Sequence, residues 1–288
     1  MKKLLMLLSL IIVVTFSACK PEPEPEPTPG SGNTSQERAK IAKIYVDAYG
    51  SGKHLSEVWI WDKEQLKKIE HYSDNSIVYE EYYTYNEKGQ IVRIDDFSEG
   101  EYIEYTYDGN KLSKARLYYD GELEEDWRFT YKDNKISKIE FLGEDYKDAR
   151  NINVLSFVLP CESIDYVYEM VNNVSQCRSG LTLELTWDGD NISQIEGFED
   201  AARVILDYKY DKKLNPFNNL LGMYVEDYWE DLLGSKNNVT QIVASYYEDG
   251  ENAVEITNYS YIYEGDYPTV KRENDNVTGS YVWYYEYK

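Results

Sequence analysis

One segment of the chain repeats itself almost residue for residue. The stretch Tyr105–Ala115 returns as Phe129–Ile139, and each copy contains an aromatic residue, a polar turn and an apolar tetrad. The wider segment Glu101–Leu142 reads as four strands joined by two tight turns and one wider turn. A fixed sequence period of this size predicts a series of similar supersecondary units, so the repeat restricts the fold more than any other feature.

The same pattern extends beyond this segment. Aromatic residues directly before turns lie 22 to 24 residues apart at Trp61, Tyr85, Tyr107 and Tyr131, and Trp187 continues the series. An apolar tetrad follows each turn: Leu66–Ile69, Ile91–Ile94, Leu112–Ala115, Ile136–Ile139, Ile192–Ile195 and, after a longer connection, Val239–Ile242.

Each unit fits a β-hairpin. The pairs Asp108-Gly109, Asp133-Asn134 and Asp188-Gly189 tolerate the positive φ that tight hairpin turns require. Strict alternation supports strands, because a period of two places alternate side chains on one face. One largely apolar face comprises Leu123, Glu125, Trp127, Phe129 and Tyr131, whereas Glu124, Asp126, Arg128 and Thr130 form the polar face.

The sequence therefore predicts an all-β fold. The 30 tyrosines agree with this class, because aromatic and β-branched residues favour strands. The pattern predicts sixteen strands: 41–49, 55–61, 66–72, 77–85, 90–97, 101–107, 111–119, 123–131, 135–142, 181–187, 191–196, 203–210, 239–247, 253–263, 269–275 and 280–287. An antiparallel meander of this length is expected to curl or close into a barrel, because open twisted sheets rarely exceed about ten strands.

Two segments interrupt the hairpins. Residues Gly143–Gly180 contain a helical spacing of apolar residues over 163–171, and Pro216–Lys236 contains a short helix expected over 225–233. We interpret both as helical insertions in hairpin loops. Long loops are common positions for binding residues.

The N-terminus has the features of an export signal. Residues 1–18 combine a basic start, an apolar run and small residues before Cys19, which resembles the lipobox of bacterial lipoproteins and predicts lipidation of Cys19. Residues 19–40 form a linker rich in Pro and Glu, whose extended conformation spans about 30 Å over ten residues. Residues 41–288 are then expected to form a single barrel-like domain.

The charge balance excludes one class of partner. With 53 acidic and 30 basic residues the net charge is −23, and such a surface repels nucleic acid phosphates. The acidity by itself indicates only a well-solvated surface.

Cys161 and Cys177 lie within the first insertion. In an oxidising compartment a disulfide between them is the leading interpretation, and two free buried thiols are the alternative. The absence of a nearby His pair argues against a zinc site.

The sequence contains no recognisable catalytic constellation or cofactor motif. His54 and His71 are the only histidines, and a packed or solvated role is the preferred interpretation of His71. The acidic residues are too numerous to single out a catalytic pair. Asp188–Asn191 superficially resembles part of a calcium loop but is interpreted as a turn. No enzyme, metal or cofactor is therefore predicted.

Aromatic residues offer the remaining functional signal. Most of the six tryptophans fall on apolar alternation and are expected to pack in the core. Tyr224, Tyr228 and Trp229 in the second insertion are the candidates for ligand binding, for example to sugar rings.

A family resemblance rests on Tyr210–Phe217 together with Ser235–Ile242. With these segments the chain resembles a family of uncharacterised bacterial lipoproteins, a domain of unknown function with a porin-like fold, whose repeats are similar to the Tyr-Asp repeats of large surface proteins. The resemblance covers most of residues 41–288. It implies a barrel-like antiparallel meander and supplies no catalytic residue.

These observations together lead to a functional hypothesis. We expect a lipid-anchored protein of the Gram-negative outer membrane, facing the cell surface or the periplasm, that binds a glycan or envelope protein without catalysis. A channel-like barrel in the outer membrane is the alternative, and a hydrolase that uses carboxylates is a more distant one. Many of the predicted strands are shorter than the about 9 to 11 residues that a membrane-spanning strand needs. Glu125 on an apolar face also argues against a membrane-spanning wall.

Overall fold

The computed structural model describes residues 39–96, 100–142, 181–199, 202–218, 235–248, 251–274 and 281–288. Several predicted features lie outside these residues: lipidation at Cys19, the Pro/Glu linker, the Cys161–Cys177 disulfide, both helices, and the aromatic residues Tyr224, Tyr228 and Trp229. Residues Ala39–Lys288 form one compact unit.

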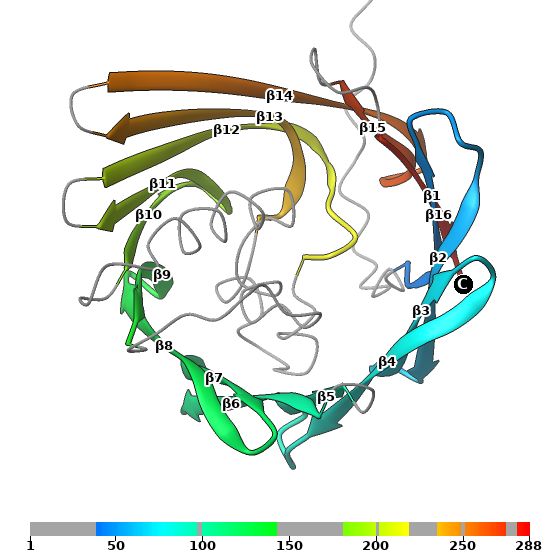
Figure 1. Ribbon diagram of the computed structural model, residues 1–288, viewed down its shortest axis with the longest axis horizontal. Coiled ribbons are helices and arrows are strands. Elements are labelled where there is room, and N and C mark those ends of the chain that lie inside the picture. Colours follow the sequence, from blue (N-terminus) through cyan, green and yellow to red (C-terminus); the bar gives the residue numbers. More distant parts are fainter. Residues whose placement is uncertain are drawn as a thin grey trace, which may run out of the picture. The chain divides into compact units, whose positions relative to one another are not determined.

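This unit is an antiparallel barrel of sixteen strands, as the sequence pattern predicted (Figure 1). The strands are β1 (Ile41–Ala48), β2 (His54–Asp62), β3 (Gln65–Ser73), β4 (Ser76–Tyr85), β5 (Ile91–Asp96), β6 (Glu101–Asp108), β7 (Lys111–Tyr119), β8 (Glu122–Lys132), β9 (Lys135–Phe141), β10 (Thr182–Asp188), β11 (Asn191–Glu199), β12 (Ala202–Leu214), β13 (Asn237–Glu248), β14 (Glu251–Glu264), β15 (Tyr267–Asn274) and β16 (Tyr281–Tyr287).

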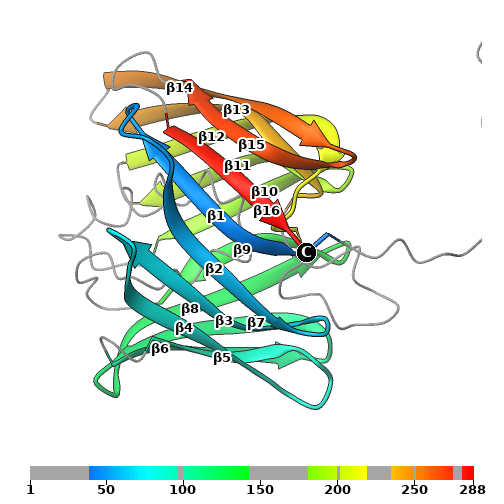
Figure 2. The same ribbon diagram turned by 90° about the vertical axis from the view of Figure 1, so that its right-hand side faces the viewer.

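The barrel closes where the first and last strands meet. Each strand pairs with its sequence neighbours, and β1 pairs with β16 from Ile41 opposite Tyr287 to Ala48 opposite Tyr281. Closure satisfies the backbone groups of strands that would otherwise be edges. Figure 2 shows β1 and β16 side by side along the barrel wall.

The tight turns have the backbone conformation that their residues predicted. Asp133 and Asn134 have φ of 53° and 64° between paired Lys132 and Lys135, as a two-residue hairpin turn requires. Gly189 has a φ of 55° between paired Asp188 and Asn191, so the interpretation of Asp188–Asn191 as a turn is confirmed.

Alternation along strands such as β8 gives them a buried and an accessible face. On β8, Glu125, Trp127 and Phe129 are buried, whereas Arg128 and Thr130 are exposed. The prediction that Leu123 shares the buried face is wrong, because its side chain is 50% exposed. The β7–β8 register shifts between Leu123 and Glu125, and this bulge reverses the alternation before Glu125.

Contacts across the barrel show that the buried face points inward. Phe217, which follows β12, has its ring centroid 6.0 Å from Trp59 on β2 and 6.0 Å from Tyr285 on β16. Neither strand neighbours β12 in the barrel, so these side chains meet in the interior. The inner wall is mainly apolar and includes fully buried Trp127 and Ile139.

The outer wall of β3 to β8 is charged. Lys68 lies 2.6 Å from Glu70 and 2.7 Å from Glu80, Arg93 lies 2.6 Å from Asp95, and Arg116 lies 3.2 Å from Asp126. These exposed or half-buried pairs contribute little stability, about 0 to 1 kcal/mol each, but they keep this wall hydrated. Exposed apolar side chains are found on β14, where Val254, Ile256 and Ile262 point outward.

A repeated hydrogen bond joins strands near the tight-turn rim, the end of the barrel that carries turns such as Asp108–Lys111 and Asp188–Asn191. An aromatic residue near the end of one strand donates to a carbonyl at the start of the preceding strand, over 2.6 to 2.8 Å. We call these bonds aromatic latches: Trp61 to Ile41, Tyr85 to Leu66, Tyr107 to Ile91, Trp187 to Ile136, Tyr210 to Ile192, Tyr261 to Val239 and Tyr287 to Pro268.

Candidate functional site

Polar side chains interrupt the apolar inner wall on five neighbouring strands. We call this set the inner polar row, and it consists of Glu57, His71, Tyr79, Glu81, Asp96 and Glu101. Strand register brings them together, because Glu57 pairs with His71 and His71 pairs with Tyr79. Farther along the row Glu81 pairs with Asp96, which pairs with Glu101.

The alternation that builds the core also directs these residues inward. His71 is two positions from buried Ile69 on β3, and Asp96 is two positions from buried Ile94 on β5. Asp96 is 1% exposed and Glu101 is 3% exposed, so both carboxyl groups are almost fully removed from water. Burial of ionisable groups is costly unless other groups compensate it, so such a row is unusual in a wall built for packing alone.

His71 lies at the centre of the best-defined contacts in the row. Its Nε2 atom is 3.2 Å from Oε1 of Glu81, and its ring stacks on Tyr79 with a centroid distance of 3.9 Å and an interplanar angle of 10°. Tyr83 donates a hydrogen bond to the other oxygen of Glu81. These contacts fix both the plane of the imidazole and the carboxylate that it faces.

Glu57 approaches His71 from the opposite side, on β2. Its Oε2 atom accepts a hydrogen bond of 2.7 Å from Nε1 of Trp59. Burial raises the pKa of Glu57, although the charge of His71 and the Trp59 bond act in the opposite direction. A carboxyl group with a raised pKa beside a second carboxylate is an arrangement that proton-transfer sites also use.

The pKa of His71 is raised as well. Burial alone lowers this pKa, but the hydrogen bond and charge of Glu81, together with the charges of Glu57 and Asp96, outweigh burial. The protonated imidazole is therefore the form that these carboxylates stabilise.

The row offers hydrogen-bond acceptors, a titratable imidazole and the flat ring of Tyr79. Such groups suit a hydroxylated ligand, because carboxylates bind hydroxyl groups while aromatic faces pack against the carbon skeleton. Among the residues that the structure describes, no group of three or more His, Cys, Asp or Glu side chains is arranged to hold a metal ion.

Sequence reasoning missed most of this site. His71 is packed in the inner wall, which agrees with its preferred interpretation, but its contacts with Glu81 and Tyr79 were not expected from the sequence. Glu57, Glu81, Asp96 and Glu101 were not distinguished from other acidic residues. The sequence does contain a sign of this site, because polar residues occupy inward positions on consecutive strands. Those positions can be recognised as inward and adjacent only when the strand register is known.

The tryptophan prediction is confirmed where the structure tests it. Trp59 and Trp127 are buried, and Trp61, Trp187 and Trp283 are partly buried against the core.

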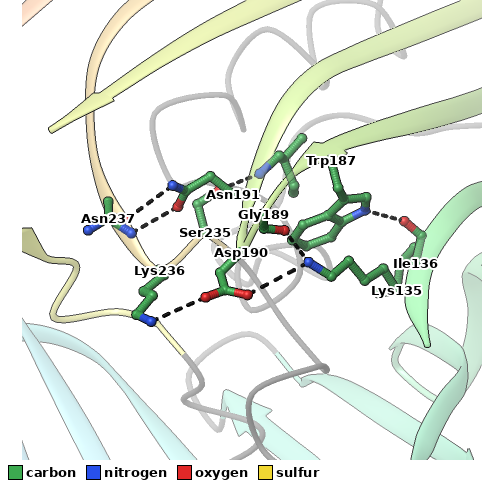
Figure 3. Close-up of polar contacts among 10 residues, drawn as sticks. Lys135, Ile136, Trp187, Gly189, Asp190, Asn191, Ser235, Lys236 and Asn237 are labelled. Carbon is green, nitrogen blue, oxygen red and sulfur yellow. Dashed lines mark hydrogen bonds and ion pairs between the residues drawn. The ribbon is translucent and has the colours of Figure 1, made fainter. Parts of the chain in front are cut away.

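A second polar cluster lies at the tight-turn rim, where the second insertion leaves and rejoins the barrel (Figure 3). Ser235 accepts a hydrogen bond of 3.0 Å from the Ile192 amide and donates one of 2.8 Å to the Tyr210 hydroxyl. Asn191 and Asn237 bond each other twice, at 3.0 Å each. Lys135 and Lys236 flank Asp190 on the neighbouring turn.

Asp211 completes the base of this insertion. It accepts hydrogen bonds from the amides of Lys213 and Asn238, at 2.9 and 3.2 Å, and from the hydroxyl of Tyr263. We call Asp211, Ser235 and Asn237, with the groups that they bond, the insertion clamp. Because it joins β11, β12, β13 and β14, the clamp fixes the positions from which the insertion departs. The predicted ligand-binding residues Tyr224, Tyr228 and Trp229 belong to that insertion and lie outside the described residues.

No helix in the described ranges is long and apolar enough to cross a membrane.

Comparison with known proteins identifies the fold. No protein-family model matches the sequence, and no curated protein matches it. Among solved structures, a porin-like protein from Bacteroides uniformis aligns with a TM-score of 0.50 and 11% identity, over 86% of this chain and 98% of that one. A porin-like protein from Bacteroides vulgatus aligns with a TM-score of 0.51 and 11% identity, over 87% and 99% of the two chains. At this identity the likeness concerns the fold alone, and it agrees with the predicted porin-like barrel.

Proposed function

We propose that this chain is a lipid-anchored barrel of the bacterial cell envelope that binds a glycan or another envelope component without catalysing a reaction. The observation that carries the binding proposal is the inner polar row, in which Glu57, His71 and Glu81 face the interior of a mainly apolar wall. Apolar residues would pack this position at lower cost, so the polar groups are better explained by a ligand.

The polarity of the outer and inner walls of the barrel favours this function over the alternative of a membrane channel. A spanning barrel needs an outward apolar band about 25 Å tall and a polar interior. Here the outer wall carries ion pairs such as Arg93–Asp95 and Arg116–Asp126, and the inner wall is mainly apolar. This distribution suits a wall that faces water.

The anchor belongs to the same proposal and has its own test. Residues 1–19 predict export and lipidation at Cys19, so the full-length protein is expected in the membrane fraction of expressing cells. Changing Cys19→Ser should move the protein to the soluble fraction. Retention of the Cys19→Ser variant in the membrane fraction would contradict the anchor.

Binding is tested with the full-length protein in detergent on an array of envelope glycans. We propose two contributing groups, Tyr79 of the inner polar row and the insertion residues Tyr228 and Trp229. Tyr79→Ala, and separately Tyr228→Ala with Trp229→Ala, should weaken binding at least about tenfold, which corresponds to about 1.4 kcal/mol. Tyr102→Ala on the outer wall is the control. Failure of the unchanged protein to bind any envelope glycan or protein would overturn the proposal.

A hydrolase is the second candidate, and the Glu57–His71–Glu81 arrangement is the observation that favours it. A carboxyl group with a raised pKa beside a second carboxylate is the pair that glycoside hydrolysis uses. Chromatography of bound glycans after prolonged incubation distinguishes the two candidates. Intact glycan supports binding alone, whereas shortened products that disappear with Glu57→Gln would establish hydrolysis.

A further inference from the structure

The contacts of His71 connect three consecutive strands of the inner wall. His71 on β3 faces Glu57 on β2 and Glu81 on β4, and its ring lies on Tyr79, also on β4. The side chains of His71 and Glu81 are only 15% and 13% exposed. Water therefore screens this charge pair much less than it screens a surface ion pair.

The geometry points to a switch: we propose that His71, with Glu57 and Glu81, forms a proton-sensitive link that tightens β2, β3 and β4 when the imidazole is protonated and loosens them when it is neutral. The link concerns the barrel itself and does not depend on the ligand proposed above.

The surroundings of the imidazole account for this behaviour. Within the described part of the chain, the charged groups that act on His71 are Glu81, Glu57 and Asp96, so all of them are acidic. Trp59 donates to Glu57 and Tyr83 donates to Glu81, which holds both carboxylates in place. When His71 loses its proton, Glu57 and Glu81 face each other across a neutral ring, and like charges in a buried site repel each other.

The direction of the pH dependence follows from proton binding in the two states. The pKa of His71 is raised above the ordinary value of 6.5, so the folded barrel binds this proton more tightly than the unfolded chain. The resulting stabilisation is complete below pH 6.5 and is lost as the pH rises through the higher folded value. Glu57 also has a raised pKa, so its contribution likewise decreases as pH rises, beginning near its ordinary value of 4.5.

The first experiment is an NMR titration of the histidine ring protons in the full-length protein. The chain contains two histidines, and the other one, His54, lies exposed at the start of β2. The His54→Gln variant assigns the two signals. We expect the His71 signal to titrate with a midpoint above 6.5, and a midpoint at or below 6.5 would overturn the proposal.

The second experiment measures urea unfolding from about pH 5.5 to about pH 8.5, the range in which histidine titrates. The unfolding midpoint of the unchanged protein should fall as pH rises, whereas His71→Gln should remove most of that fall. Glu81→Gln should bring the His71 titration closer to 6.5, which tests the pair without removing the histidine. The same pH dependence in His71→Gln as in the unchanged protein would contradict the switch.

Discussion

At the scale of the residue, the bulge between Leu123 and Glu125 determines which side chains of β8 enter the core. Leu123 and Trp127 occupy positions of the same parity on β8, yet Leu123 is 50% exposed and Trp127 is fully buried. The register shift between Leu123 and Glu125 separates them. Trp127 contacts Phe141 at a centroid distance of 4.9 Å and donates a hydrogen bond of 2.7 Å to Glu125.

This difference predicts unequal effects of two alanine substitutions on the same strand. Trp127→Ala should lower the free energy of unfolding by about 3 to 5 kcal/mol, because it leaves a cavity in the inner wall. Leu123→Ala should change it by about 0.5 kcal/mol or less, as expected for an exposed position. Urea denaturation of both variants measures the two effects, and a comparable loss in Leu123→Ala would contradict the outward orientation of Leu123.

At the scale of the element, the aromatic latches give a structural reason for aromatic residues such as Trp61, Tyr85 and Tyr107 before the turns. Each latch reaches from one strand to the strand before it in the sequence, and Tyr107 on β6 thereby ties the β6–β7 hairpin to Ile91 on β5. Register shifts directly before Tyr85, Tyr107 and Tyr131 re-aim these side chains toward the rim. At Tyr85 and Tyr107 the aromatic residue before the turn thus ties its hairpin to the preceding strand.

Removal of one latch should have a small and specific cost. Tyr107→Phe keeps the ring but leaves the Ile91 carbonyl without this donor, so we expect a loss of about 0.5 to 1.5 kcal/mol in the free energy of unfolding. Tyr102→Phe, on the outer wall of the same strand, is the matched control. Equal unfolding midpoints for Tyr107→Phe and the unchanged protein would contradict a stabilising role of the latch.

The insertion clamp predicts a local effect. Asp211→Ala removes the acceptor of the Lys213 and Asn238 amides, so hydrogen exchange at these two amides should become faster and stability should fall by about 1.5 to 3 kcal/mol. Asp266→Ala removes only an exposed ion pair with Lys213 and should cost less than about 1 kcal/mol. Unchanged exchange in Asp211→Ala would mean that other groups hold the base of the insertion.

At the scale of the whole molecule, the pairing of β1 with β16 leaves none of the described strands with an unpaired edge. Removal of residues 281–288 would expose the pairing edges of β1 and β15. The shortened protein should aggregate or lose cooperative unfolding, because unpaired edges in a Tyr-rich sheet can pair with other chains. Size-exclusion chromatography measures this outcome, with removal of Lys288 alone as the control. A monomeric shortened protein would show that closure is dispensable.

Local sequence patterns were sufficient to predict the positions of the strands. All sixteen predicted strands are present, because a period of two, turn residues such as Asp133-Asn134 and the repeated tetrads are properties of neighbouring residues. The largest difference is at the end of β12, predicted at residue 210 and observed at Leu214. That extension depends on the pairing of Leu214 with Asn237, a contact between residues separated by the insertion.

Neighbouring residues alone were enough to predict the all-β class, the strands, the tight turns and the alternation between apolar and polar faces. Only the folded chain shows that the meander closes with β1 on β16, that the apolar face is the inner one, and that Glu57, His71 and Glu81 meet. Strand formation depends on local spacing, whereas closure and the inner polar row depend on register between strands, which residues distant in sequence set together.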